Sequence, residues 1–570
     1  MKRYENAVFW KHRFKVFIKT VLLALLIFVI IHLTAAIGMI SVFLLDSYGW
    51  LSVLKFAYAQ AVAYINPDYM ILYTYPDGTA VWAPAVTITS DPTIIRELRI
   101  MLSGMAQYFL YSSVIYLLIP VAIGVLFSEK QSKRGEHIKG ARLISVRQFR
   151  ALVRKRNDAG SLGLPFGDSA MPESCQNKSM LLIGKPGVGK STLLKSLLSR
   201  LRDKGVKLII YDFKGEYVEN FHADGDIIFN PFDDRSIDWS LFREIKTPMD
   251  IDSIASSLIP SLDGTSADPF WSDGGRDLFA SIIIFLYKNN FKCNMDIWNM
   301  VSSDAETILG NLRSTKGCEK GTKYIMNPDS KQALSILAVM MQYAKCFEYM
   351  PDGDENFSID DWVENGNGNL FITSNASVQS SLKPILSLFI DLLSKKILAM
   401  PDYEMNKTVF LLDEFTSLQR LPSLISLLTL GRSKNVTCFL GTQSFGQIEA
   451  LYGRASKESI LNSCGNNVIF SMADAATAKY CSDIIGQSES IVSEKSFSTG
   501  SDYREGASLS YRNKTEPIIL PSEFMGLRDL ECIIKFANYP AVKSKLEYKP
   551  YEKRHESFVL RNDLLLKTKS

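Results

Sequence analysis

The sequence has little of what a zinc-binding or disulfide-stabilised protein needs. Its 570 residues include five histidines and eight cysteines, and no two cysteines stand at C-x-x-C spacing. The pattern supports neither a metal cluster nor a disulfide framework, so we expect reduced, buried thiols. The formal net charge is only +4, which is too small to indicate nucleic-acid binding by itself.

Two windows lack charge altogether. Residues 20–45 and 100–127 contain no Asp, Glu, Lys or Arg, and each exceeds the roughly 20 apolar residues that cross a bilayer. A cleaved signal peptide is disfavoured, because its apolar region is typically about 7–15 residues long. We therefore expect two transmembrane helices, at 20–45 and 100–127, with a kink at Pro120 in the second.

Flanking cations predict the orientation of these spans. The first 19 residues are basic, and ten Lys and Arg against three acids lie in 128–160, whereas 46–99 has only Lys55, Arg96 and Arg99 as cations. The positive-inside rule places both termini in the cytoplasm and the 46–99 loop outside. The basic juxtamembrane linker, 128–178, is expected to contact anionic lipid or to set the topology, and a DNA-facing role stays open.

A phosphate-binding loop follows the apolar run Met180–Ile183. Residues 184–191 fit G-x-x-x-x-G-K-S and open a Leu-rich helix at Thr192–Leu201. Backbone N–H groups of such a loop surround phosphates, its Lys reaches the β and γ phosphates, and its Ser holds Mg²⁺. The sequence therefore predicts ATP or GTP binding with Mg²⁺. The expected nucleotide contacts are Gly184, Lys185, Pro186, Gly187, Val188, Gly189, Lys190, Ser191 and Thr192, with Ser191 also on the metal.

Short apolar runs alternate with helical patterns after residue 178. They predict an α/β fold with a doubly wound parallel sheet, which we assign to 179–247 and 365–550. The expected strands are Met180–Ile183, Val206–Tyr211, Asp226–Phe229, Asn369–Thr373, Thr408–Leu412, Val436–Leu440 and Asn467–Ser471.

The alternation stops within 248–364, which reads as an all-α inserted domain. The helices expected there are Asp250–Leu258, Asp273–Lys288, Met295–Leu312 and Lys331–Met350. Ser488–Lys514 is rich in Ser and Gly and predicts a mobile loop or a hairpin. Residues 551–570 are expected to be a short C-terminal tail.

A second set of residues fits nucleotide hydrolysis. The strand Thr408–Leu412 ends in Asp413 and Glu414, where the first acid can hold the Mg²⁺ water shell and the second can polarise the attacking water. Gln443, after the next strand, is a candidate sensor of the γ-phosphate. Arg432 is a candidate arginine finger for a neighbouring subunit. Each of the last two residues can instead be an ordinary polar side chain.

These pieces together resemble the TraD type of type IV coupling protein, the membrane ATPase of bacterial conjugation. The resemblance covers about 140–540 and implies a RecA-like P-loop domain. The motifs that carry it are Tyr211–Glu216, Phe229–Asp233, Asp268–Trp271, Leu412–Leu424, Gly431–Arg432, Gly441–Ser444 and Gln447–Gly453.

The resemblance implies a homo-hexameric ring on the bacterial inner membrane that uses ATP to move DNA. Its partners would be relaxase-bound single-stranded DNA, relaxosome proteins and a type IV secretion channel. Family members often carry a long acidic tail, but this sequence ends at Ser570 with five cations near its end, so recognition through such a tail is in doubt. Trp271 and Tyr503 are candidates for stacking on bases, against the commoner packing role of aromatics.

Other functions remain open from the sequence alone. The cargo can be an effector protein instead of DNA, since the nucleotide site would look the same. An ATP-gated docking receptor is disfavoured by Glu414, because a receptor needs no water-polarising acid. A chromosome-segregation motor usually has more membrane spans and a separate sequence-reading module, and neither is visible here.

Overall fold

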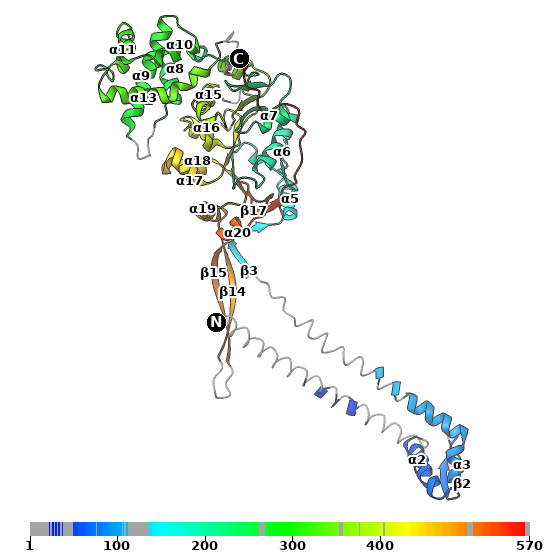
Figure 1. The fold of residues 1–570 in the computed structure, drawn as a ribbon. Helices are drawn as coiled ribbons and strands as arrows, with labels where there is room; N and C mark the ends of the chain where they lie inside the picture. The colour runs from blue at the N-terminus through cyan, green and yellow to red at the C-terminus, as the bar shows by residue number, and fades with distance from the viewer. Residues whose placement is uncertain are drawn as a thin grey trace, which may run out of the picture. The chain divides into compact units, whose positions relative to one another are not determined.

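The structure is a computed structural model of the whole chain (Figure 1). It describes residues 22, 26–27, 29–30, 32–34, 37, 49–75, 77–104, 106–107, 110–111, 136–261, 268–352, 357–375, 377–402, 405–498 and 506–564. The chain divides into two compact units, Met1–Lys133 and Arg134–Ser570. Each unit is described by itself below.

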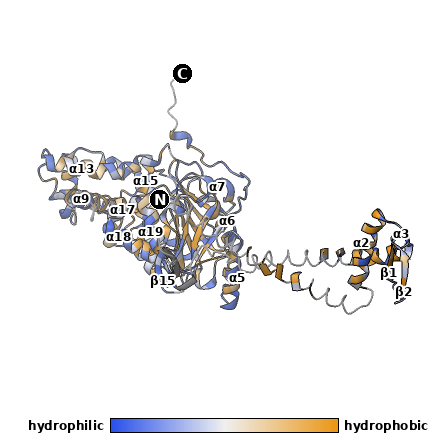
Figure 2. Cartoon of the chain, turned by 90° about the horizontal axis from the view of Figure 1, so that it is seen from below, coloured by the Kyte–Doolittle hydropathy of each residue, from blue (hydrophilic) through white to orange (hydrophobic). Residues whose placement is uncertain are grey.

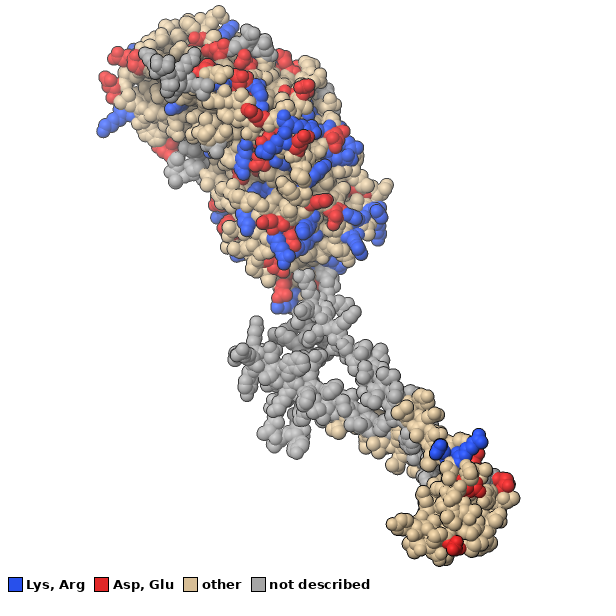
Figure 3. Space-filling model, turned by 45° about the vertical axis from the view of Figure 1, so that its right-hand side comes forward, with Lys and Arg blue, Asp and Glu red and all other residues tan. Residues whose placement is uncertain are grey.

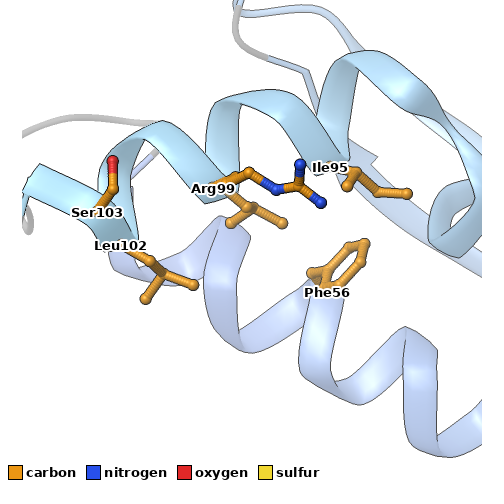
Figure 4. Close-up of a pocket in the computed structure, with 6 residues that line it drawn as sticks. Phe56, Ile95, Arg99, Leu102 and Ser103 are labelled. Atoms are coloured by element: carbon orange, nitrogen blue, oxygen red, sulfur yellow. The ribbon is translucent and has the colours of Figure 1, made fainter.

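The first unit contains a small α/β element. Helix α2 (Gly49–Ile65), the antiparallel strands β1 (Met70–Thr74) and β2 (Ala80–Pro84), α3 (Ala85–Ser90) and a helical segment at 92–104 enclose a small apolar core. A pocket lined by Phe56, Ile95, Leu98, Arg99, Leu102 and Ser103 lies between α2 and that segment (Figure 4). Most of the predicted spans 20–45 and 100–127, Pro120 included, lies outside the described residues. Among the residues that are described, none belongs to a helix with the length and apolarity to traverse a bilayer.

A ten-stranded sheet forms the centre of the second unit. Its strand order is β4-β17-β16-β13-β7-β12-β11-β8-β10-β9. The bounds are β4 (Leu143–Ile144), β7 (Met180–Ile183), β8 (Lys207–Asp212), β9 (Ile227–Phe229), β10 (Leu370–Thr373), β11 (Thr408–Leu412), β12 (Val436–Thr442), β13 (Asn466–Ile469), β16 (Glu531–Lys535) and β17 (Ala541–Lys545). All seven predicted strands are present, with ends shifted by up to two residues.

The expectation of a parallel sheet is wrong at one edge. The strands from β13 to β9 are parallel, but β16 runs antiparallel to β13, β17 runs antiparallel to β16, and β4 pairs parallel to β17. Part of the expected juxtamembrane linker is therefore folded into the sheet. Strands β7, β11 and β12 are buried along their whole length, as sheets covered on both faces require. Figure 2 shows hydrophobic residues in the strands at the centre of this unit.

Helices cover both faces of this sheet (Figure 1). On one face lie α5 (Val146–Lys155), α6 (Lys190–Asp203) and α7 (Glu216–Phe221), whose apolar residues share a core with that side of the strands. On the other lie α15 (Gln379–Ala399), α16 (Leu424–Leu430), α17 (Phe445–Tyr452), α18 (Arg454–Ser463) and α19 (Ala475–Ile485), whose core extends into the inserted helices.

Between Pro248 and Asn365, the regular secondary structure of the described residues is helical, apart from one isolated bridge at Phe357. They are α8 (Pro248–Leu258), α9 (Pro269–Lys288), α10 (Asn294–Val301), α11 (Ala305–Arg313), α12 (Glu319–Thr322), α13 (Lys331–Ala344), the 3₁₀ turn η3 (Lys345–Tyr349) and α14 (Ile359–Asn365).

Two of the predicted inserted helices are shorter than expected. The single helix expected at Met295–Leu312 is two, because Asp304 caps α11 by accepting a 2.9 Å hydrogen bond from the Thr307 N–H. The helix expected at Lys331–Met350 is α-helical only to Ala344 and tightens into η3.

The Ser-rich segment forms a hairpin, one of the two predicted alternatives. Strands β14 (Gln487–Ser498) and β15 (Gly506–Pro517) pair along their length, and β3 (Glu136–Gly140) adds to β14 as a third antiparallel strand. The connection at 499–505, with Tyr503, lies outside the described residues.

The C-terminal segment packs on the second unit as far as it is described. The Arg554 backbone N–H donates to the Glu219 carbonyl at 2.8 Å, and Arg561 Nη1 donates to the carbonyls of Pro231 (2.8 Å) and Tyr349 (3.0 Å). The segment therefore contacts α7 through its backbone, and the Arg561 side chain joins the residues after β9 to η3.

Candidate nucleotide-hydrolysis site

The phosphate-binding loop joins β7 to α6 at the carboxyl edge of the sheet. Gly187 and Gly189 have φ angles of 81° and 114°, a region that favours glycine. A Cβ on Gly184 would lie 2.6 Å from the Phe470 Cβ, whereas a Cβ on Gly187 would meet no atom within 4 Å. The loop is thus packed tightly against the protein at its start and faces open space at Gly187.

Lys190 lies inside this loop. Its side chain is only 8% exposed, and its ammonium group donates to the carbonyl oxygens of Gly184 and, at 3.3 Å, of Lys185. Burial lowers the pKa of Lys190, while the charges of Glu414 and Asp413 act in the opposite direction. The structure therefore brings Lys190 and the two predicted acids into one electrostatic environment.

Both acids follow β11, which is separated from β7 by β12. The Asp413 backbone packs closely against Gly441 of β12. Only glycine fits there, since a Cβ on residue 441 would lie 1.8 Å from the Asp413 carbonyl oxygen. Burial and the neighbouring Glu414 charge raise the pKa of Asp413 to about 6, while Lys190 opposes this shift. The Asp413 carboxyl thus lies in a partly desolvated site with a cation nearby.

Gln443 contacts Glu414 directly. Its Nε2 donates a 3.1 Å hydrogen bond to Glu414 Oε2. The other carboxylate oxygen, Oε1, accepts a 2.8 Å hydrogen bond from Thr416 Oγ1. Thr416 lies in the motif Leu412–Leu424, but the sequence does not indicate its contact with Glu414, because that contact depends on the turn that follows Glu414.

Arg432 is not near the phosphate-binding loop of the same chain. It is exposed and precedes β12, at the opposite edge of the sheet from the loop. The seven residues of β12 separate the two edges by about 20 Å at roughly 3.3 Å per residue. Within one chain, the structure therefore joins Gln443 but not Arg432 to the other candidates.

Two further residues support this edge of the sheet. Asp212, at the end of β8, is fully buried and accepts hydrogen bonds from the Tyr217 and Val218 N–H groups at 2.7 and 2.9 Å, which fixes the start of α7. Burial raises the pKa of Asp212 to about 7, against the effect of these bonds. The Tyr217 hydroxyl is buried and forms no hydrogen bond with the described residues. Its polar group nevertheless lowers the pKa of the Asp413 carboxyl. Asp212 lies in the motif Tyr211–Glu216, which contributes to the family resemblance, but the sequence alone indicates no role for it at this site.

The donor groups at this edge fit Mg²⁺. Ser191 lies in the first turn of α6 and Asp413 directly follows β11, so a hydroxyl and a carboxylate are available, and hard cations prefer such oxygen ligands. Among the described residues, no group of three or more His, Cys, Asp or Glu forms a separate metal site. The open space at Gly187 is consistent with a loop that accepts a phosphate group.

Other sequence-based candidates have mixed outcomes. None of the eight cysteines forms a disulfide and seven are buried, but Cys293 is exposed, so the expectation of buried thiols is wrong there. Trp271 is 36% exposed at the start of α9 and packs edge-to-face on Phe270, with ring centroids 5.1 Å apart.

On the face of the second unit drawn in Figure 3, cations and anions are interspersed, so no single sign of charge dominates that view.

Comparisons with known proteins agree with this geometry. A family model described as type IV secretion-system coupling protein DNA-binding domain matches residues 164–547. The coupling protein TraD of Escherichia coli (strain K12) is 29% identical over 444 residues, which are 76% of this chain and 61% of TraD. The chain thus spans about three-fifths of the length of that curated relative.

Solved structures give the same result. The unbound bacterial conjugative coupling protein TrwBΔN70 has a TM-score of 0.67 and 26% identity, over 75% of this chain and 98% of that one. TrwB in complex with ADP and Mg²⁺ has a TM-score of 0.65, and its complex with a non-hydrolysable ATP analogue has one of 0.66, with the same identity and coverage. Because the family model matches well over half of the sequence, the chain belongs to the family of TraD-type type IV secretion-system coupling proteins.

Proposed function

We propose that this protein is an ATPase that delivers relaxase-bound single-stranded DNA to a type IV secretion channel during conjugation. The observation that carries the proposal is the convergence of Lys190, Asp413, Glu414 and Gln443 at one edge of a TrwB-like sheet. A docking receptor without hydrolysis would need the phosphate-binding loop but not a second acid held by two hydrogen bonds. TrwB structures with ADP and Mg²⁺ and with an ATP analogue support the choice of cofactors.

Each residue has a distinct role in the proposed reaction. Backbone N–H groups of residues 184–192 surround the phosphates, and the Lys190 ammonium pairs with their negative charge. Ser191 and Asp413 would hold Mg²⁺, which when bound neutralises charge on the phosphates. Glu414 accepts a proton from the attacking water, and Gln443 orients Glu414 and contacts the γ-phosphate. Arg432, exposed and remote from its own loop, would reach the site of a neighbouring subunit in a homo-hexameric ring.

The proposed location is the bacterial inner membrane, with both termini in the cytoplasm. The charge-free windows 20–45 and 100–127 would form the two anchoring helices, and the basic residues around them set the orientation. The inserted helices of 248–364 would then face the cytoplasm, where relaxosome proteins and DNA are available.

ATP hydrolysis by the full chain in detergent, with and without single- and double-stranded DNA, tests this function. We expect hydrolysis that DNA stimulates and that Lys190→Ala abolishes. Hydrolysis that depends on Lys190 but does not respond to DNA would favour an effector protein as cargo. Absence of nucleotide hydrolysis under all conditions would refute the proposed ATPase.

A further inference from the structure

The carboxylate of Glu414 has hydrogen bonds on both of its oxygens. Oε2 accepts from Gln443 Nε2 at 3.1 Å, and Oε1 accepts from Thr416 Oγ1 at 2.8 Å. A hydrogen bond to a charged carboxylate is stronger than one between neutral groups. The two donors approach from different segments, so together they restrict rotation of the carboxylate about its terminal bond.

The turn after Glu414 brings the Thr416 hydroxyl back to this carboxylate. Residues Phe415–Ser417 form a 3₁₀ turn, η4, whose first side chain is fully buried. Ser417 Oγ donates to the Glu414 carbonyl oxygen at 2.7 Å and lies 2.8 Å from the Tyr211 hydroxyl. The turn is thus fixed to β8 and to the core, so Thr416 is held in place and does not sample solvent freely.

A third side chain, Gln447 on α17, completes the arrangement. Thr416 Oγ1 lies 3.3 Å from Gln447 Oε1, an arrangement in which the threonine hydroxyl would have to donate to the amide oxygen. A threonine hydroxyl has one proton, and the shorter bond to the charged Glu414 takes it. The consistent assignment therefore has the Gln447 NH₂ group donating to Thr416 Oγ1, which is the other orientation of an amide whose O and N positions are interchangeable.

We propose that Thr416 is a positioning residue that orients the Glu414 carboxylate for attack by water and that Gln447 of α17 orients Thr416. This inference rests on the proposed role of Glu414 as general base. Gln443 lies in the connection between β12 and α17, and Gln447 lies on α17 itself, so the orientation of Glu414 depends on the position of α17 against η4. No covalent step is assigned to Thr416.

Steady-state hydrolysis by the full chain tests the inference. We compare Thr416→Val, which keeps the shape and removes the hydroxyl, with Thr416→Ser, which restores it. Thr416→Val should lower kcat about tenfold, the effect of losing one charge-assisted hydrogen bond at a part-exposed site. KM and the affinity for a fluorescent ATP analogue should stay within twofold, and Thr416→Ser should recover most of kcat. Thr429→Val is the matched control, because Thr429 is exposed on α16 and bonds only to its own helix.

A second readout does not depend on activity. Thermal unfolding of the wild type, Thr416→Val, Glu414→Ala and the double variant forms a double-mutant cycle. If the two side chains interact, Thr416→Val should lower the melting temperature less when Glu414 is already absent.

The outcomes separate this inference from the function on which it rests. Lys190-dependent hydrolysis with unchanged kcat in Thr416→Val overturns the positioning role and leaves the ATPase intact. Failure of Thr416→Ser to recover kcat, or equal loss of nucleotide affinity, also overturns it, because the defect would then be structural. A wild type that does not hydrolyse nucleotide overturns both.

Discussion

Asp391 is a buried carboxylate at the contact between the inserted helices and the helices that cover the sheet. It lies in the middle of α15, is fully buried, and forms an ion pair with Lys395 at 3.1 Å. It also accepts hydrogen bonds from Ser257 Oγ of α8 at 2.6 Å, from the Ser423 N–H at 2.8 Å and from the Ser423 hydroxyl. Ser423 ends the segment that begins at Glu414, so one carboxylate joins three separate elements.

We predict that Asp391→Ala lowers the free energy of unfolding by about 3–5 kcal/mol. Removing one partner of a buried ion pair typically costs about that much, and the abandoned Ser423 N–H adds to it. Loss of the ion pair alone accounts for the lower part of this range, because the Lys395 side chain is 29% exposed and its ammonium group can be solvated once Asp391 is removed. For a cooperative unit of roughly 400 residues, with an unfolding entropy of about 2.1 cal/mol/K per residue, the melting temperature should fall by about 4–6 °C.

Thermal unfolding of the full chain, followed by circular dichroism, measures this effect. Asp391→Asn should lose less stability, because the amide oxygen still accepts from Ser423. The control is Glu449→Ala, which breaks a 2.6 Å ion pair with Lys457 on a side chain that is 48% exposed; such pairs contribute about 1 kcal/mol or less. If the melting temperature of Asp391→Ala lies within about 1 °C of that of the control, the hydrogen bonds and ion pair of Asp391 do not contribute the predicted free energy of unfolding.

Three further predictions concern the nucleotide site. Glu414→Gln should bind ATP as the wild type does but lose about 10²–10⁴-fold in hydrolysis, measured by phosphate release beside nucleotide binding; normal hydrolysis would remove Glu414 as general base. Arg432→Ala should reduce hydrolysis only in the assembled oligomer, and an unchanged rate there, with the oligomeric state checked by sedimentation, would remove Arg432 from the site. The folded state raises the pKa of Asp212 from 3.8 to about 7, so it retains a proton that the unfolded chain loses, and stability should fall as pH rises from about 4 to 7. Asp212→Asn should flatten that slope in melting temperature, and an equal slope in both proteins would contradict the burial argument.

The sequence predicts the α/β unit best where local chemistry decides the structure. The G-x-x-x-x-G-K-S spacing works only between a strand and a helix, and β7 and α6 stand at those positions. Likewise, Val409–Leu412 is a continuous apolar run, as expected of a strand that is covered on both faces. In both places the residues that carry the chemistry also define the element that positions them.

Elements that depend on distant partners could not be predicted in this way. The two residues of β4 form a strand only because β17, almost 400 positions later, lies beside them, and β16 and β17 carry no strong local signal. Other features are local but depend on a single side-chain contact: Thr416 reaches Glu414 through the turn η4, and α10 and α11 are separate helices because Asp304 caps α11. None of these features has a periodicity that sequence reasoning can detect.

The pairing of β4 with β17 also has a consequence for the order in which the protein matures. The chain is synthesised from its N-terminus, so β4 leaves the ribosome long before its only partner strand exists. The sheet can be completed only after β17 has followed, and closing so long a loop is slow. This edge of the sheet is therefore completed last, after the phosphate-binding loop, Asp413 and Glu414 have all been synthesised.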